Sequence, residues 1–112
     1  MYYYLYYFLC YNFNDDDYSL IEFEWSDEKE KINIEKHGLN FSIAALVFGD
    51  NNRIERFDYS HSINEERYIT IGRIKSTTTI LFIVFSYRNG KIRIISARKA
   101  NKREEEVYYE NQ

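Results

Sequence analysis

The alternation of apolar and polar residues changes its period along the chain, and each change marks the boundary of a predicted element. LIEFEW, residues 20–25, alternates apolar with acidic side chains, which is typical of a strand with one buried face. Ser26 is a favourable helix N-cap, and acidic residues follow it in the first helical turn. The pattern therefore predicts a strand and then a helix that runs to His37 and stops at Gly38, a suitable left-handed residue.

A second helix and four strands are predicted next. Asn40 can cap the apolar segment SIAALVF, residues 42–48, which has to pack against another part of the protein. Asn89-Gly90 is the strongest short hairpin signal in the chain. ILFIVF is apolar without alternation, which favours the middle of a sheet. The four strands are predicted over residues 53–59, 67–74, 77–87 and 91–98.

A last helix is predicted after Asn101, because Glu104 three residues later completes the pattern of a capping box. The order is then strand, two helices, four strands and helix. This order is typical of an α+β domain with helices grouped against an antiparallel sheet, here of about four to five strands. The 112 residues of the chain are enough for one modest core, which we assign to residues 21–112.

The tyrosine-rich residues 1–20 are not predicted to belong to that core. MYYYLYYFLCYNF has 13 residues, whereas a membrane span needs about 20, and it lacks the features of a signal peptide. Asp15, Asp16 and Asp17 follow, which no core accepts unpaired. Three interpretations stay open: an extra strand, an adhesive disordered arm, or sequence upstream of the real start. We expect an extension that the core fold does not need.

The net charge of −3 conceals one strongly basic block. Residues 67–103 contain ten Lys or Arg and no Asp or Glu, while residues 1–66 carry five basic and fourteen acidic side chains. Residues 104–112 add four acidic ones. This distribution indicates an anion-binding surface on the strands of the basic block. The alternative is an ordinary solvated sheet face, or a face that pairs with an acidic helix.

The few cysteines and histidines limit the chemistry. One Cys excludes an internal disulfide framework, which fits a reducing cytoplasmic setting. Two His without repeated ligand spacing give no reason to expect a zinc site. We expect no cofactor and no metal.

Three patches resemble one family, in this order along the chain. They are FEWSDEKEKINIEKHGLNFSIAALVFGD, DYSHSINEERYITIGR and KIRIISARKANKREEEVYYE, and they resemble the BrnT toxins of bacterial type II toxin–antitoxin modules. The resemblance extends from Phe23 to about Glu110. Ser26 stands where the family usually has Asp, and Ser42 and Ile43 stand where an acidic residue is common.

The resemblance implies a RelE-like fold and ribonuclease activity that stops translation. It also implies a BrnA-like antitoxin with a ribbon-helix-helix part, through which alone the pair would contact operator DNA. A dimer within that complex is compatible with this arrangement, and no membrane partner is expected.

Cleavage of RNA by its own 2′-hydroxyl requires a base, cations that stabilise charge on the phosphate, and an acid, but no metal. Arg binds phosphate through two hydrogen bonds at once. The candidates for the catalytic step are His37, His61, Glu66, Arg67 and Arg98. The candidates for RNA binding are Lys36, Arg73, Arg88, Arg93 and Lys99.

Three of the catalytic candidates have a structural alternative of their own. His61 lies in a polar loop and suits proton transfer near neutral pH, but it can equally be a surface turn residue. Glu66 can act as a base, orient a neighbour, or pair with an arginine. His37 stands in the last helical turn, where it stabilises the helix end, and the resemblance adds a site role for it with Lys36.

Strand periodicity restricts the arginines of the last strand. It places Arg93 and Arg98 on opposite faces unless a bulge intervenes, and we prefer Arg98 for the site. Tyr108 on the last helix can be a catalytic phenol, although packing against the sheet is the favoured interpretation.

Two further functions are alternatives to an RNA-cleaving toxin. A non-catalytic module could use the same basic face to bind an acidic protein segment or nucleic acid. A DNA-binding regulator is poorly supported, because no helix-turn-helix pattern is present and the basic residues lie on strands.

Overall fold

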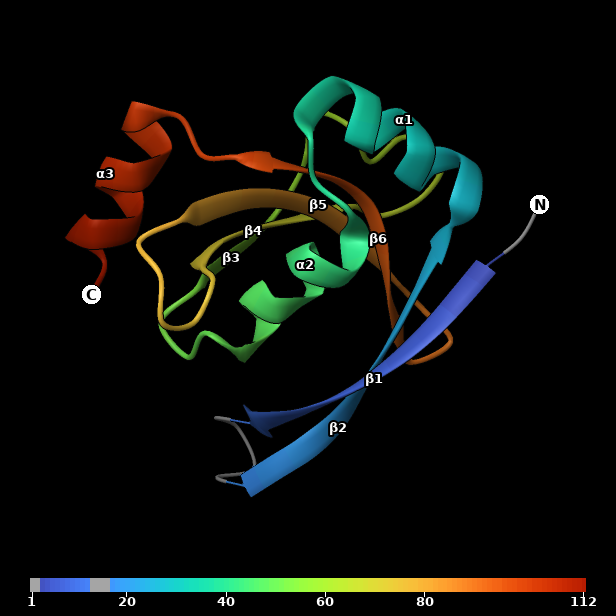
Figure 1. Cartoon of the computed structure of the whole chain (residues 1–112), viewed down its shortest axis with the longest axis horizontal. Coiled ribbons are helices and arrows are strands. Elements are labelled where there is room, and N and C mark those ends of the chain that lie inside the picture. The colour runs from blue at the N-terminus through green and yellow to red at the C-terminus, as the bar shows by residue number, and fades with distance from the viewer. Residues whose placement is uncertain (1–2, 13–16) are drawn as a thin grey trace.

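The computed structural model describes the backbone of residues 3–12 and 17–112 and the side chains of residues 21–112. In these ranges six strands form one sheet in the order β1-β2-β6-β5-β4-β3 (Figure 1). The strands are β1 (Tyr3–Asn12), β2 (Asp17–Ser26), β3 (Ile54–Phe57), β4 (Tyr68–Arg73), β5 (Ile80–Arg88) and β6 (Lys91–Lys99). The helices are α1 (Asp27–His37), α2 (Phe41–Ala45), a 3-10 turn η1 (Leu46–Gly49) and α3 (Lys102–Glu110). The α+β class is confirmed.

The sheet is mixed, so the prediction of a wholly antiparallel sheet is wrong for one pair. β2 and β6 run parallel, with Phe23 opposite Ile92 and Glu24 opposite Arg93. All other neighbouring strands are antiparallel. A parallel pair needs a long crossover connection. Here the chain from α1 to β5 forms that connection between β2 and β6. The alternation of apolar and polar residues does not indicate whether two strands run parallel or antiparallel.

Part of the tyrosine-rich segment forms the edge strand β1. Its backbone pairs with β2 from Tyr3 opposite Ser26 to Asn12 opposite Asp17. Among the three interpretations of this segment, the structure corresponds to the extra strand. The expectation that the core fold does not need it stays a prediction, and residues 1–2 and 13–16, with Asp15 and Asp16, lie outside the described residues.

The helix boundaries follow the capping signals in the sequence. Ser26 accepts a hydrogen bond from the backbone N–H of Lys29, and Gly38 ends α1 in the left-handed region with φ 69°. Asn40 caps α2, which is five residues long. The 3-10 turn η1 then continues the helical segment to Gly49. Asn101 and Glu104 form the predicted capping box of α3.

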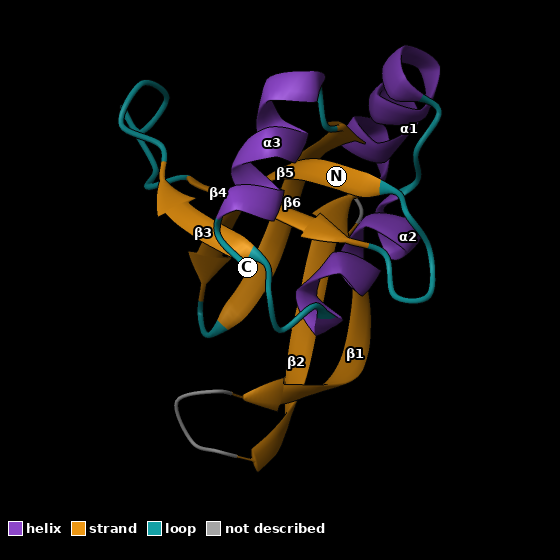
Figure 2. Ribbon diagram, turned by 90° about the vertical axis from the view of Figure 1, so that its left-hand side faces the viewer, coloured by secondary structure: helices purple, strands orange, loops and turns teal. Residues whose placement is uncertain are grey.

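Apolar side chains gather on both faces of the sheet. The larger cluster packs α2 and η1 against one face, with Phe41, Phe48 and Phe85 fully buried. On the other face, Tyr108 of α3 packs against Ile69 and Ile71. Figures 1 and 2 show α2 and α3 on different sides of β5.

A bulge in β6 decides which side chains share a face. Val84 lies opposite Ser96 and Phe85 lies opposite Ile94, so Ile95 is the extra residue. Arg93, Ser96 and Arg98 are therefore opposite Ser86, Val84 and Phe82, which alternate along β5 on one face. This bulge is the irregularity that strand periodicity required, and Arg93 and Arg98 lie on the same face of the sheet.

Beyond its short pairing with β2, the outer edge of β6 is completed by a side chain. The Asn33 Oδ1 atom accepts from the backbone N–H of Ala97 at 3.0 Å, and its Nδ2 donates to the carbonyl oxygen of Ala97 at 2.9 Å. Nδ2 also donates to the carbonyl oxygen of Leu39 at 2.9 Å. Asn33 thus takes the place of a neighbouring strand and fixes α1 against β6.

Candidate functional site

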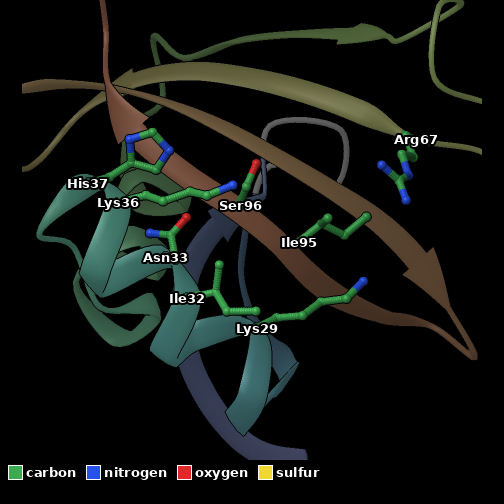
Figure 3. A pocket seen from close by; sticks show the side chains of 8 residues that line it. All are labelled: Lys29, Ile32, Asn33, Lys36, His37, Arg67, Ile95 and Ser96. Carbon is green, nitrogen blue, oxygen red and sulfur yellow. The ribbon is translucent and has the colours of Figure 1, made fainter.

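A pocket of about 280 Å³ lies between α1, β6 and the start of β4. Four of its lining residues are basic, namely Lys29, Lys36, His37 and Arg67, and none carries a carboxylate. Figure 3 shows Lys36 and His37 near Ser96, with Lys29 and Arg67 towards the other end. Ile32, Asn33, Ile95 and Ser96 complete the lining. An anion is the ligand that this arrangement favours.

Helical spacing and the β6 bulge build two walls of the pocket. Lys29, Asn33 and Lys36 are four and three residues apart, so they lie along one face of α1. The bulge brings both Ile95 and Ser96 into the opposite wall. The acidic Glu30 is engaged elsewhere, because its carboxylate accepts from the backbone N–H of Phe41 at 2.8 Å.

Arg67 is held at the pocket by the loop that precedes β4. Its backbone N–H donates to the Ser62 hydroxyl at 2.9 Å, and its carbonyl oxygen accepts from the backbone N–H of Asp58 at 2.8 Å. These bonds fix the backbone of Arg67 where the loop meets the sheet. Among the ten predicted site residues, the structure brings Lys36, His37 and Arg67 together in the pocket.

Comparison with known proteins agrees with the motifs. A family model described as ribonuclease toxin, BrnT, of type II toxin-antitoxin system matches residues 25–104. The chain belongs to the BrnT toxin family. The resemblance seen in the sequence is confirmed, and with it a family role as a ribonuclease toxin that has an antitoxin partner. All residues that line the pocket of this BrnT chain lie in the matched segment. No curated protein matches the chain.

His61 and Glu66 of the BrnT chain do not line the pocket. His61 is exposed in its loop, and its Nδ1 atom lies 3.0 Å from Oδ2 of the buried Asp58. This contact directs Nε2 away from the carboxylate, an orientation that suits proton transfer. Glu66 is exposed and accepts from the Tyr68 hydroxyl at 3.3 Å. Their catalytic roles stay predictions.

Arg98 lies away from the pocket and is bound within the protein. Its two Nη atoms donate to the two carboxylate oxygens of Glu104 at 2.7 and 2.9 Å. Its guanidinium lies 4.1 Å from the centre of the Phe82 ring. These contacts join β6 to the start of α3, so the geometry gives Arg98 a structural task.

The other predicted RNA-binding residues are distributed over the same sheet. Arg93 is buried and lies 3.7 Å from Glu24, while Arg88 lies 3.3 Å from Glu65. The backbone N–H of Arg73 donates to Asp50 Oδ2 at 2.8 Å. Lys99 is exposed at the end of β6. None of these four residues lines the pocket.

Tyr108 is buried, in agreement with the packing interpretation. Its hydroxyl donates to Asp50 Oδ2 at 2.6 Å. Burial, together with this carboxylate, raises the pKa of Tyr108 to about 12. The phenol therefore stays protonated at neutral pH.

Sequence patterns missed Lys29, Ser96 and the anchoring role of Asn33. The spacing of Lys29, Asn33 and Lys36 indicates that they share one face of a helix, and this signal was available in the sequence. The bulge that brings Ser96 to the pocket has no corresponding signal in the sequence. In the described residues no three His, Cys, Asp or Glu side chains gather as metal ligands, and no described helix is long and apolar enough to cross a membrane.

The Arg98–Glu104 pair should make the BrnT chain less stable in acid. The hydrogen bonds from Arg98 lower the pKa of Glu104, with burial opposing them. Because the unfolded carboxyl group has the higher pKa, the stabilisation is present above about pH 4.5 and is lost as the pH falls through the folded pKa. Glu104→Gln should cost about 1 to 2 kcal/mol at pH 7, since Arg98 stays partly solvated. Urea unfolding from pH 7 to 3 measures both effects.

Glu106→Gln is the control for that prediction, because Glu106 and Arg103 form an exposed pair 3.7 Å apart. Its effect on the free energy of unfolding should stay below about 0.5 kcal/mol. Equal losses for the two variants would contradict the structural importance of the Arg98–Glu104 pair.

Proposed function

We propose that this protein is a metal-independent endoribonuclease of RelE-like fold, the toxin of a cytoplasmic type II toxin–antitoxin module. A BrnA-like antitoxin with a ribbon-helix-helix part holds it inactive and carries the contact with operator DNA. The RNA 2′-oxygen attacks the adjacent phosphorus, the bond to the 5′-oxygen breaks, and a cyclic phosphate and a 5′-hydroxyl result. One proton leaves the 2′-hydroxyl and one is delivered to the 5′-oxygen.

The observation that carries the proposal is the pocket with four basic side chains and no carboxylate. A phosphate placed there would meet Lys29, Lys36 and Arg67, which can stabilise the charge that builds up in the transition state. Ile32 and Ile95 provide apolar surface on which a base or ribose can lie.

Proton transfer is assigned to His37, because an imidazole can both accept and donate a proton near neutral pH. His37 is exposed and lines the same pocket as the cations. The His61–Asp58 pair is the second candidate, since a buried carboxylate orients its ring. Glu66 and Arg98 are weaker candidates for proton transfer, because Glu66 accepts from the Tyr68 hydroxyl and Arg98 donates to Glu104.

The test is cleavage and binding of RNA by purified protein in EDTA. We expect wild-type cleavage, and affinity for an uncleavable 2′-O-methyl RNA that falls steeply with salt. The double variant Lys29→Ala, Lys36→Ala should reduce the slope of log K against log salt by about 1.4, or about 0.7 for each lost phosphate contact on a single strand. The matched control is Lys75→Ala, Lys102→Ala, which removes two exposed lysines outside the pocket.

The rival function is a non-catalytic binding module, and the same assay separates the two. Salt-dependent binding without cleavage, on free RNA and then in a translating extract, would favour the module. An unchanged salt slope in the Lys29/Lys36 variant would remove the pocket as the RNA site.

A further inference from the structure

We propose that Glu65 is a positioning residue, which holds Arg67 at the pocket as the shared carboxylate of an arginine cluster. The cluster comprises Glu65, Arg67, Arg88 and Arg93 around the buried Ser86. The catalytic consequence rests on the proposed function, whereas the placement of Arg67 can be tested without it.

Glu65 pairs directly with one arginine, and the strand register brings two more arginines to the neighbouring row. Glu65 Oε2 lies 3.3 Å from Arg88 Nη2. Ser86 is fully buried and lies opposite Arg93 in the pairing of β5 with β6. Arg67 directly precedes Tyr68, which lies opposite Phe85, the neighbour of Ser86. Arg67, Ser86 and Arg93 therefore form a row across three adjacent strands, with Glu65 at the end of the same loop as Arg67.

Three guanidinium groups on one sheet face repel each other unless anions separate them. Glu24 lies 3.7 Å from Arg93 and compensates the side of the row nearest β2. Glu65 is the carboxylate on the other side, beside Arg67 and Arg88. Without its charge, the guanidinium of Arg67 would lose its attraction to the sheet and swing into solvent.

The environment of Glu65 suits holding better than proton transfer. The Ser86 hydroxyl lowers its pKa, burial opposes this, and Arg88, Arg93 and Arg67 lower it further. One carboxylate oxygen, Oε1, is buried without a hydrogen-bond partner among the described residues, and the side chain is only 33% exposed. A carboxylate that is kept ionised and partly covered is a poor base for a substrate hydroxyl, but it is a good anchor for cations.

Glu66 is the natural control for Glu65. It is the next residue, it is exposed, and its carboxylate accepts a hydrogen bond from the Tyr68 hydroxyl. Glu65→Gln and Glu66→Gln both remove one charge from the same loop at nearly constant shape. Only the first removes the anion of the arginine cluster.

The deciding measurement is the NMR signal of the Arg67 side-chain Nε–Hε group, which is resolved and protected when the guanidinium is held in place. Glu65→Gln should move this signal to the position of a solvated arginine, and Glu66→Gln should leave it unchanged. An unchanged Arg67 signal in folded Glu65→Gln would overturn the proposal. If Glu65→Gln does not fold, Glu65→Asp replaces it, since the shorter side chain withdraws the charge from the cluster.

Cleavage kinetics provide the second readout. Glu65→Gln should lower kcat about tenfold with KM within about twofold of wild type. In the Arg67→Ala background, Glu65→Gln should have no further effect, because Glu65 acts through Arg67. Additive losses, or tighter RNA binding by Glu65→Gln, would contradict the positioning role. Absence of cleavage in the wild type would reject the proposed function, while the NMR result would still decide the role of Glu65.

Discussion

His37→Gln is expected to lower the rate of RNA cleavage about a hundredfold, whereas His61→Gln is expected to change it less than threefold. Removal of a positioned acid–base group costs about 10² to 10⁴ in rate. The two histidines are the only ones in the chain, and only His37 lines the basic pocket. Glutamine keeps polar character at both positions but cannot transfer a proton at neutral pH.

Single-turnover cleavage of a short RNA, with both variants at saturating protein, measures the chemical step directly. Affinity for 2′-O-methyl RNA should stay within about threefold of wild type in both variants, because both keep every Lys and Arg side chain of the pocket. The reverse order of rates would move the proton-transfer site to the His61–Asp58 pair in the neighbouring loop.

Asn33→Leu is expected to lower the free energy of unfolding by about 3 kcal/mol. The leucine leaves the buried N–H and C=O groups of Ala97 without the partners that Asn33 supplies. Each unsatisfied buried group costs about 1 to 3 kcal/mol, and burial of the leucine offsets part of the sum. Asn33 also donates to the carbonyl oxygen of Leu39. The substitution should therefore also weaken the packing of α1, which forms one wall of the pocket.

Urea unfolding followed by circular dichroism measures this loss, and Asn111→Leu is its matched control. The side chain of Asn111 is exposed, and its amide group donates to the carbonyl oxygen of Val107. Its replacement should change the free energy of unfolding by about 0.5 kcal/mol or less. A loss of similar size in the two variants would show that the edge of β6 does not depend on Asn33.

The sequence by itself determined the local structure and the family. Capping residues such as Ser26, Asn40 and Asn101 placed the helix starts, since each satisfies backbone groups within its own turn. The Asn89-Gly90 turn and the apolar run of β5 predicted the central hairpin. The order of three motif patches was enough to recognise the family that residues 25–104 match.

Tertiary structure alone decided which basic residues share a site. Lys29 and Arg67 come from segments far apart in the chain, and only the packing of α1 along the edge of β6 brings them to one pocket. The bulge at Ile95 placed Arg93 and Arg98 on one face, which simple alternation cannot reveal. Arg98 is bound by Glu104 in the folded protein. The sequence does not show this pairing, and a charged side chain is available to a ligand only when no partner within the fold has bound it.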